Sequence, residues 1–139
     1  MGTGKTAVCV IAGASIGGKK LVICPPTLRV NWEREIKLLF PDADVEILRN
    51  TDEPEIKAEW TIIGYPTAVK YYDELSHQGI AALFIDEAHY IQAVNNYGAP
   101  DSDRAYSVLY IAKTVEYVIP VTGTPKTNRN KNLFNPLKL

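Results

Sequence analysis

The sequence predicts an α/β fold built around a mainly parallel sheet. Five short apolar runs alternate with segments in which apolar residues recur at helical spacing, the pattern of successive βαβ units. The chain has 139 residues, 46% of them hydrophobic, which suits one domain with its own core. Lys and Arg number 15 against 16 Asp and Glu, so the composition excludes an intrinsically disordered chain and gives no global sign of nucleic acid.

The first predicted elements follow from apolar spacing and from glycine and proline. Residues 5–15 predict a helix that ends before the glycine pair at 17–18, and residues 21–24 predict a short buried strand. Thr27 follows two prolines and is placed to cap a second helix. We expect this helix to run to about Phe40, because its apolar residues also recur at helical spacing.

The central part of the chain contributes two more strands, at 45–48 and 60–65. Around the first of them, residues 42–59 hold seven acidic residues against two basic ones, which predicts a solvated surface. A helix is expected to follow at about 66–75.

The last predicted elements begin with a strand at 82–86, where four apolar residues run into an acid. Adjacent asparagines, a glycine and a proline predict a loop at 94–103. A helix at 104–114 and a fifth strand at 117–121 complete the alternation.

The two cysteines, Cys9 and Cys24, each lie inside an apolar segment. Two buried thiols are therefore favoured over a disulfide, and no metal-ligand spacing occurs, so we expect a reducing intracellular setting. No apolar run approaches the roughly 18 residues that span a bilayer, and no signal peptide opens the chain, so no membrane partner is expected.

The second half of a phosphate-binding loop opens the first predicted helix: Gly2-Thr3-Gly4-Lys5-Thr6. Glycines let backbone N–H groups turn around phosphate oxygens, and the amino end of a helix adds partial positive charge. Lys5 would neutralise the β- and γ-phosphates of a nucleotide, and the Thr6 hydroxyl would hold Mg²⁺. The alternative is a flexible glycine-rich terminus, since the first glycine of the full motif and its preceding strand are absent from the sequence.

Two acids stand at the end of the fourth predicted strand, Asp86 and Glu87. A carboxylate in that position suits the edge at which α/β sheets bind ligands. Asp86 would coordinate Mg²⁺ through water, and Glu87 would orient and deprotonate an attacking water. The alternative is that both acids merely favour the start of a helix. Paired with the phosphate-binding loop, however, they indicate nucleoside triphosphate hydrolysis.

Five short segments follow one another in a recognisable order: 1–6, 21–28 with 31–35, 62–65, 86–89 and 121–125. They resemble motifs I, Ia, Ib, II and III of the first RecA-like lobe of Swi/Snf-type ATP-dependent DNA translocases, in the second helicase superfamily. The sequence of motif Ia favours the annealing-helicase branch of this family. The resemblance implies one partial helicase ATP-binding domain over 1–139. It also implies a RecA-like P-loop NTPase fold, helices on both sheet faces, and ATP and Mg²⁺ as cofactors.

The resemblance further implies contacts with the backbone of duplex DNA. Motif Ia would supply Pro26, Thr27 and Arg29, and motif Ib would supply Tyr65. For Tyr65, an aromatic that covers the core at a strand end is an equally good interpretation. Trp32 is expected in the core, given its helical spacing with its apolar neighbours.

Motif III and the end of motif II would couple the γ-phosphate site to the surface that tracks DNA. The residues implied for this coupling are His89, Thr122, Gly123 and Thr124. His89 has an alternative interpretation as a partly buried histidine with a structural partner.

Local charge departs from the neutral average. The acidic stretch at 42–59 would lie far from DNA, while Arg29 and the tail after Pro125, with four basic residues and no acid, would lie nearer to it. The alternative for the tail is a solvated end.

Three features depart from the family pattern. The chain begins inside motif I, so the strand that carries the phosphate loop is missing and Tyr117–Val121 is expected to keep an unpaired apolar edge. The upstream segment that recognises adenine is also missing. The second RecA-like lobe, whose arginine finger is worth about 10³–10⁵ in rate, is missing too. Our hypothesis is that Met1 is an internal methionine of a longer translocase, and that the lobe alone is poorly active or inactive.

The leading function is therefore the lobe that couples ATP hydrolysis to movement on duplex DNA. One alternative is a non-catalytic nucleotide- or DNA-binding remnant. Another is the lobe of an RNA helicase or a restriction-enzyme motor, because these share motifs I and II.

Overall fold

A computed structural model describes residues 3–88 and 103–121 of the chain. Five parallel strands form one sheet in the order β2-β3-β1-β4-β5. The strands are β1 Lys19–Cys24, β2 Val45–Ile47, β3 Trp60–Gly64, β4 Ile80–Asp86 and β5 Tyr117–Val121. The helices are α1 Thr3–Ala14, α2 Arg29–Leu39, α3 Tyr65–Leu75 and α4 Asp103–Ala112, with a short 3₁₀ turn, η1, at Pro26–Leu28. The predicted α/β class and the parallel sheet are confirmed.

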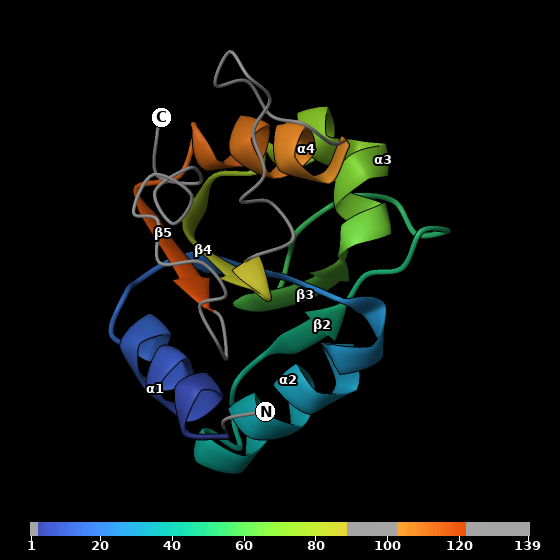
Figure 1. Cartoon of the computed structure of the whole chain (residues 1–139). Helices are drawn as coiled ribbons and strands as arrows, with labels where there is room; N and C mark the ends of the chain where they lie inside the picture. The colour runs from blue at the N-terminus through green and yellow to red at the C-terminus, as the bar shows by residue number, and fades with distance from the viewer. Residues whose placement is uncertain (1–2, 89–102, 122–139) are drawn as a thin grey trace, which may run out of the picture.

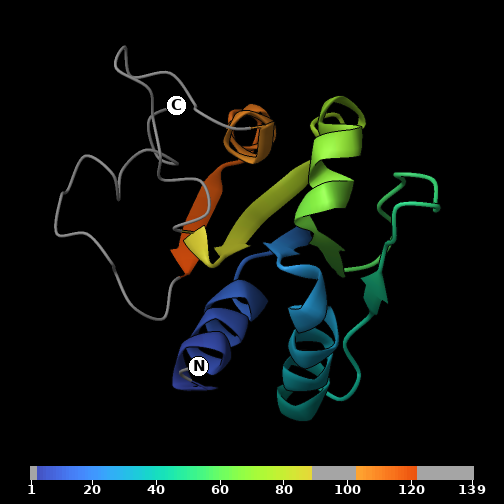
Figure 2. The same cartoon turned by 45° about the vertical axis from the view of Figure 1, so that its right-hand side comes forward.

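Helices cover both faces of the sheet, as expected. α1 and α2 lie on one face, and α3 and α4 lie on the other (Figures 1 and 2). The central strands β1, β3 and β4 are buried on both faces, because each is an almost unbroken apolar run. Alternate residues of one strand therefore feed two separate cores. Val22 and Phe84 belong to the core under α1 and α2, while Leu21 and Leu83 belong to the core under α3 and α4.

The prediction that Thr27 caps a helix is wrong. Thr27 lies inside η1 and is exposed, and the residue that precedes α2 is Leu28, which makes no side-chain capping bond. Pro26 explains the difference, because its fixed φ starts a tight turn before the α-helix proper. Most other boundaries move by one or two residues. Tyr65 opens α3 instead of ending the third strand, and Asp103 opens α4 instead of ending the loop. The remainder of the predicted loop lies outside the described residues.

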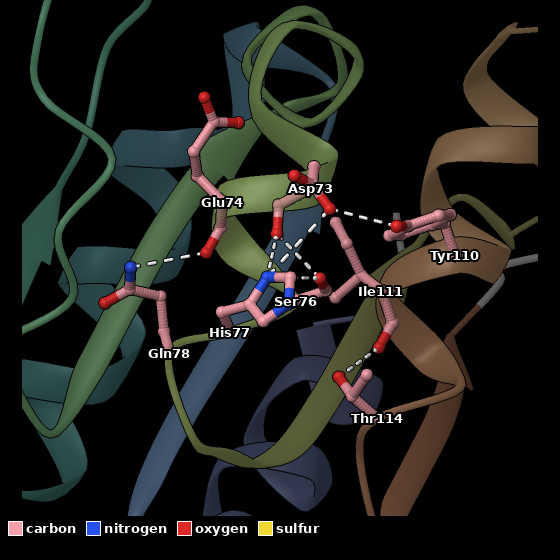
Figure 3. Close-up of polar contacts among 8 residues, drawn as sticks. All are labelled: Asp73, Glu74, Ser76, His77, Gln78, Tyr110, Ile111 and Thr114. Carbon is pink, nitrogen blue, oxygen red and sulfur yellow. Dashed lines mark hydrogen bonds and ion pairs between the residues drawn. The ribbon is translucent and has the colours of Figure 1, made fainter.

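Polar contacts at the far end of α3 tie it to α4 (Figure 3). The Tyr110 hydroxyl of α4 donates to Asp73 Oδ1 of α3 at 2.9 Å, and this hydrogen bond raises the pKa of Tyr110. The Ser76 hydroxyl and the His77 ring each contact the Asp73 carbonyl oxygen, at 2.6 and 2.7 Å, and so close the end of α3. This cluster lies at the ends of the two helices that lead into β4 and β5.

β5 lies at one edge of the sheet (Figure 1). Within the described residues it pairs with β4 alone. Its sequence, Tyr-Val-Ile-Pro-Val, is apolar, so its outer edge is both unpaired there and apolar. Tyr117 is 46% exposed at this edge. The expectation of an apolar strand with an unpaired edge is therefore confirmed for the part of the chain that the structure describes. None of the helices described there has the length and apolar character that a membrane span requires.

Candidate nucleotide-binding site

The predicted motifs meet at the carboxyl edge of the sheet because the strands are parallel and in register. Cys24 at the end of β1 pairs with Gly64 at the end of β3, and Asp86 at the end of β4 pairs with Val121 at the end of β5. Each of these four strand ends lies within one of the motif segments. A topology of this kind places ligand-binding residues from distant parts of the chain at one edge.

Asp86 is the central charged group of this edge. It is only 4% exposed, and its carboxylate accepts two N–H groups. The Trp32 indole donates to Oδ2 at 2.7 Å, and the Glu87 backbone donates to Oδ1 at 2.8 Å. The Tyr65 hydroxyl donates to the Asp86 carbonyl oxygen at 2.8 Å. Asp86 is therefore held through both its side chain and its main chain.

Glu87 adopts a left-handed backbone conformation, with φ of 56°. Among the described residues it is the one non-glycine with a positive φ. Such a conformation is uncommon for a residue with a side chain, and outliers of this kind cluster at active sites. The backbone thus leaves the extended conformation at the residue that follows Asp86, the last residue of β4.

α1 brings the phosphate-loop residues toward the same edge. Near its carboxyl end, Gly13 lies against Trp60, the first residue of β3. About one turn earlier, Cys9 lies within electrostatic reach of Asp86, the last residue of β4. α1 therefore runs antiparallel to the strands, and its first turn, with Lys5 and Thr6, points toward their carboxyl ends.

The pKa of the Cys9 thiol depends on two charged groups of the candidate site, Asp86 and Lys5. Its pKa is raised, first by burial and then by the Asp86 carboxylate, while the Lys5 ammonium lowers it. Burial, again followed by Asp86, raises the pKa of Cys24 to about 12. Both cysteines are free thiols, as the sequence predicts, although Cys9 is only partly buried. Lys5, one helical turn before Cys9, is exposed and accessible to a ligand.

The residues present fit a magnesium ion bound together with phosphates. Across residues 3–88 and 103–121, no three His, Cys, Asp or Glu side chains gather into a metal cage. Mg²⁺ rarely uses such a cage, since it keeps several waters and takes one or two carboxylates plus substrate phosphates. A carboxylate has about four acceptor positions, and the N–H groups of Trp32 and Glu87 each bond to one oxygen of Asp86.

A pocket of about 340 Å³ lies beside this edge, where motifs Ia and Ib meet. Its walls include Pro26 from η1, Arg29 from the start of α2 and Gly64 from the end of β3. Arg49 and Asn50 also line the pocket, and both belong to the acidic stretch at 42–59. Sequence reasoning missed these two residues because the chain folds back there only through tertiary contacts.

Tyr65 and Trp32 are both buried, at 2% and 1% exposure. For Tyr65 the structure favours the core interpretation, because a ring this buried offers no surface to DNA. Trp32 lies in the core as predicted, but its bond to Asp86 was not foreseen. The available signal was chemical: an indole N–H can only donate, and a buried one needs an acceptor.

Several predicted site residues lie outside the described part of the chain: Gly2, His89, Thr122, Gly123 and Thr124. Thr3 and Gly4 begin α1, but their side chains are not described. Val121, the first residue of motif III, pairs with Asp86, the first residue of motif II.

The chain resembles known proteins over nearly all of its length. It is 28% identical over 147 aligned residues to the human DNA annealing helicase and endonuclease ZRANB3, covering 96% of this chain and 13% of that protein. A probable ATP-dependent helicase of Plasmodium falciparum is 26% identical over 99% of this chain and 7% of its own length. The chain thus spans a small part of the relatives it matches.

A solved structure has the same fold. The Sulfolobus solfataricus SWI2/SNF2 ATPase core in complex with dsDNA superposes with a TM-score of 0.73 at 24% identity, over 98% of this chain and 29% of that one. The family profile described as the SNF2-related domain matches residues 1–139. The chain therefore belongs to the SNF2-related family, and its fold is that of the first RecA-like lobe of a Swi/Snf-type helicase.

Proposed function

We propose that this chain binds ATP with Mg²⁺ and contributes the hydrolytic residues of a DNA translocase. The observation that carries the proposal is that the strand register places the buried Asp86 at the carboxyl edge of the sheet, the edge toward which α1 directs Lys5. Residues far apart in the sequence thereby place a cation and a buried carboxylate at one edge of a parallel sheet. That combination suits a nucleotide bound with its metal.

Each motif residue has a distinct role in this proposal. Backbone N–H groups at Gly2, Thr3 and Gly4 would surround the phosphates, and Lys5 would neutralise the β- and γ-phosphates. Thr6 and Asp86 would hold Mg²⁺, which when bound supplies positive charge to the phosphoryl group being transferred.

Glu87 would orient a water molecule at the γ-phosphate and take its proton. The buried surroundings of Asp86 favour this chemistry, since charge interactions strengthen where water is excluded. His89, Thr122, Gly123 and Thr124 would then couple phosphate release to the surface that contacts DNA.

The pocket lined by Arg29 and Arg49 is the proposed contact with the DNA backbone. Two guanidinium groups suit phosphate oxygens, which they can bind through two hydrogen bonds each. Pro26 and Thr27 lie on the same turn as Arg29, whose Nε donates to the Pro26 carbonyl oxygen at 3.1 Å. We expect these residues to bind duplex DNA without reading its sequence.

Motion along DNA would require a second RecA-like lobe, with ATP bound between the two lobes. Of the relatives named above, one is a DNA annealing helicase and endonuclease and the other a probable ATP-dependent helicase, and the chain matches only a small part of each. An intracellular location follows from the proposed action on DNA.

The test uses two forms, the 139-residue chain for nucleotide binding and a longer protein with both lobes for hydrolysis. Lys5→Ala should weaken binding of ATP with Mg²⁺ and abolish DNA-stimulated hydrolysis. Glu87→Gln should retain binding and lose hydrolysis, since it removes the base alone. Lys113→Ala and Glu74→Gln, exposed changes at the other end of the fold, serve as controls. Equal hydrolysis by the wild type and both site variants would overturn the assigned roles.

A further inference from the structure

Two buried hydrogen bonds join Asp86 to the helices that start beside the proposed DNA pocket. Trp32 of α2 holds the carboxylate, and Tyr65 of α3 holds the carbonyl oxygen. All three residues are at most 4% exposed. Trp32 follows Arg29 by about one helical turn, so one helix carries both a wall of that pocket and a donor to the carboxylate.

In its contact with Asp86, the Trp32 side chain acts only as a hydrogen-bond donor. An indole N–H can donate but never accept, and at 2.7 Å it makes a short hydrogen bond to an oxygen of a carboxylate. The Glu87 N–H holds the other oxygen at 2.8 Å, so the two donors together fix the rotation of the carboxylate about its χ2 axis. The Trp32 ring cannot swing freely, because it packs against Phe84 with the ring centres 6.3 Å apart.

We propose that Trp32 is a positioning residue for the divalent cation. Its N–H fixes the orientation of the Asp86 carboxylate and thereby sets the affinity of the nucleotide-bound chain for the metal. This inference rests on the proposed function, since it assigns Asp86 to the metal. It differs from a packing role, because packing needs only the shape of the ring and positioning needs the N–H.

An isosteric replacement separates the two roles. Nonsense suppression can place 3-benzothienylalanine at position 32, which retains the ring shape and replaces the N–H by sulfur. The matched control is the same replacement at Trp60, whose ring stacks on Phe84 at 5.6 Å but makes no hydrogen bond to Asp86. Unfolding by urea reports the packing of each variant.

The readout is binding of Mn²⁺ to the ADP-bound chain, followed by electron paramagnetic resonance. We expect the Mn²⁺ dissociation constant to rise by about tenfold or more in the position-32 variant, the range found when partners of metal ligands are removed. ADP affinity without metal should stay unchanged, and the position-60 control should match the wild type in both measurements.

The outcomes are distinguishable. Wild-type Mn²⁺ affinity in the position-32 variant would overturn the positioning role while leaving the proposed function intact. Absence of ADP binding by the wild-type chain would contradict the proposed function, and the inference would fall with it. Trp32→Phe should shift Mn²⁺ affinity in the same direction, so the result does not depend on a single variant.

Discussion

Gly13 of α1 lies directly against Trp60 at the start of β3. A Cβ built on Gly13 would stand 2.4 Å from Cη2 of that ring and 2.9 Å from Cζ of Phe84. No real Cβ approaches another carbon so closely, so the absence of a side chain is what lets α1 sit on the sheet here. The same helix carries Lys5 and Thr6 at its other end. This contact therefore supports the position of the proposed phosphate site.

Replacing Gly13 by Ala should destabilise the fold. Alanine favours a helix by about 1 kcal/mol over glycine, whereas overpacking a core costs about 1–3 kcal/mol. Two aromatic rings would have to move, so we expect the overpacking cost to exceed the gain in helix propensity. Urea unfolding should therefore show a lower free energy of unfolding for the variant. Gly17→Ala is the control, since a Cβ there meets nothing within 4 Å. Equal or greater stability of the Gly13 variant would contradict the packing described.

The reactivity of Cys9 should report the two charges of the candidate site. The Asp86 carboxylate raises the pKa of this thiol and Lys5 lowers it. Asp86→Asn should therefore speed alkylation of Cys9 by iodoacetamide at pH 8, and Lys5→Met should slow it, because the thiolate is the nucleophile. Mass spectrometry of the Cys9 peptide measures both rates, with Glu46→Gln on β2 as the unchanged control. Two shifts in one direction would rule out the proposed arrangement.

Stability should fall at alkaline pH in a way that depends on Cys24. Burial raises the pKa of this thiol from 9.0 to about 12, so the folded state retains a proton that the unfolded state releases. The protonated thiol contributes fully to the free energy of unfolding below pH 9. This contribution is lost as pH rises toward 12, by up to about 1.4 kcal/mol per pH unit. Urea unfolding at several pH values should show a shallower decline for Cys24→Ala. Parallel declines in the variant and the wild type would argue against the shift.

Two buried threonines should respond oppositely to loss of the hydroxyl. Within the described residues, Thr61 Oγ1 is buried without a hydrogen-bond partner, whereas Thr67 Oγ1 donates to Asn50 Oδ1 at 2.5 Å. Thr61→Val should be neutral or stabilising by up to about 1 kcal/mol, and Thr67→Val should cost about 1 kcal/mol. Urea unfolding compares these isosteric changes directly. A cost at Thr61 as large as that at Thr67 would refute the assignment.

Local patterns predicted most of the architecture. The strand at 117–121 and the helix at 66–75 were placed within one or two residues, because apolar spacing and the flanking turn residues are read over a few positions. Thr27 misled the prediction because Thr at such a position commonly caps a helix, and Pro26 imposed a 3₁₀ turn instead. The candidate site was predictable only as a set of motifs at strand ends.

Contacts between residues far apart in the chain could not be predicted from the sequence. Apolar spacing placed Trp32 in the core, but nothing in the spacing identified Asp86, 54 positions later, as its acceptor. In the same way, the acidic character of 42–59 concealed that Arg49 joins Arg29 in one pocket. These relationships depend on the order and register of the strands.

By itself, the sequence determined the helices, the strands and the residue types that stand at each strand end. Propensity, periodicity and turn chemistry act over a few residues, so the sequence alone is enough to predict their effects. The tertiary structure alone decided that Trp32, Tyr65 and Asp86 meet in one buried cluster. The physical reason is that parallel strands pair only through long crossovers, so the neighbours of a side chain are set by the packing of the whole sheet.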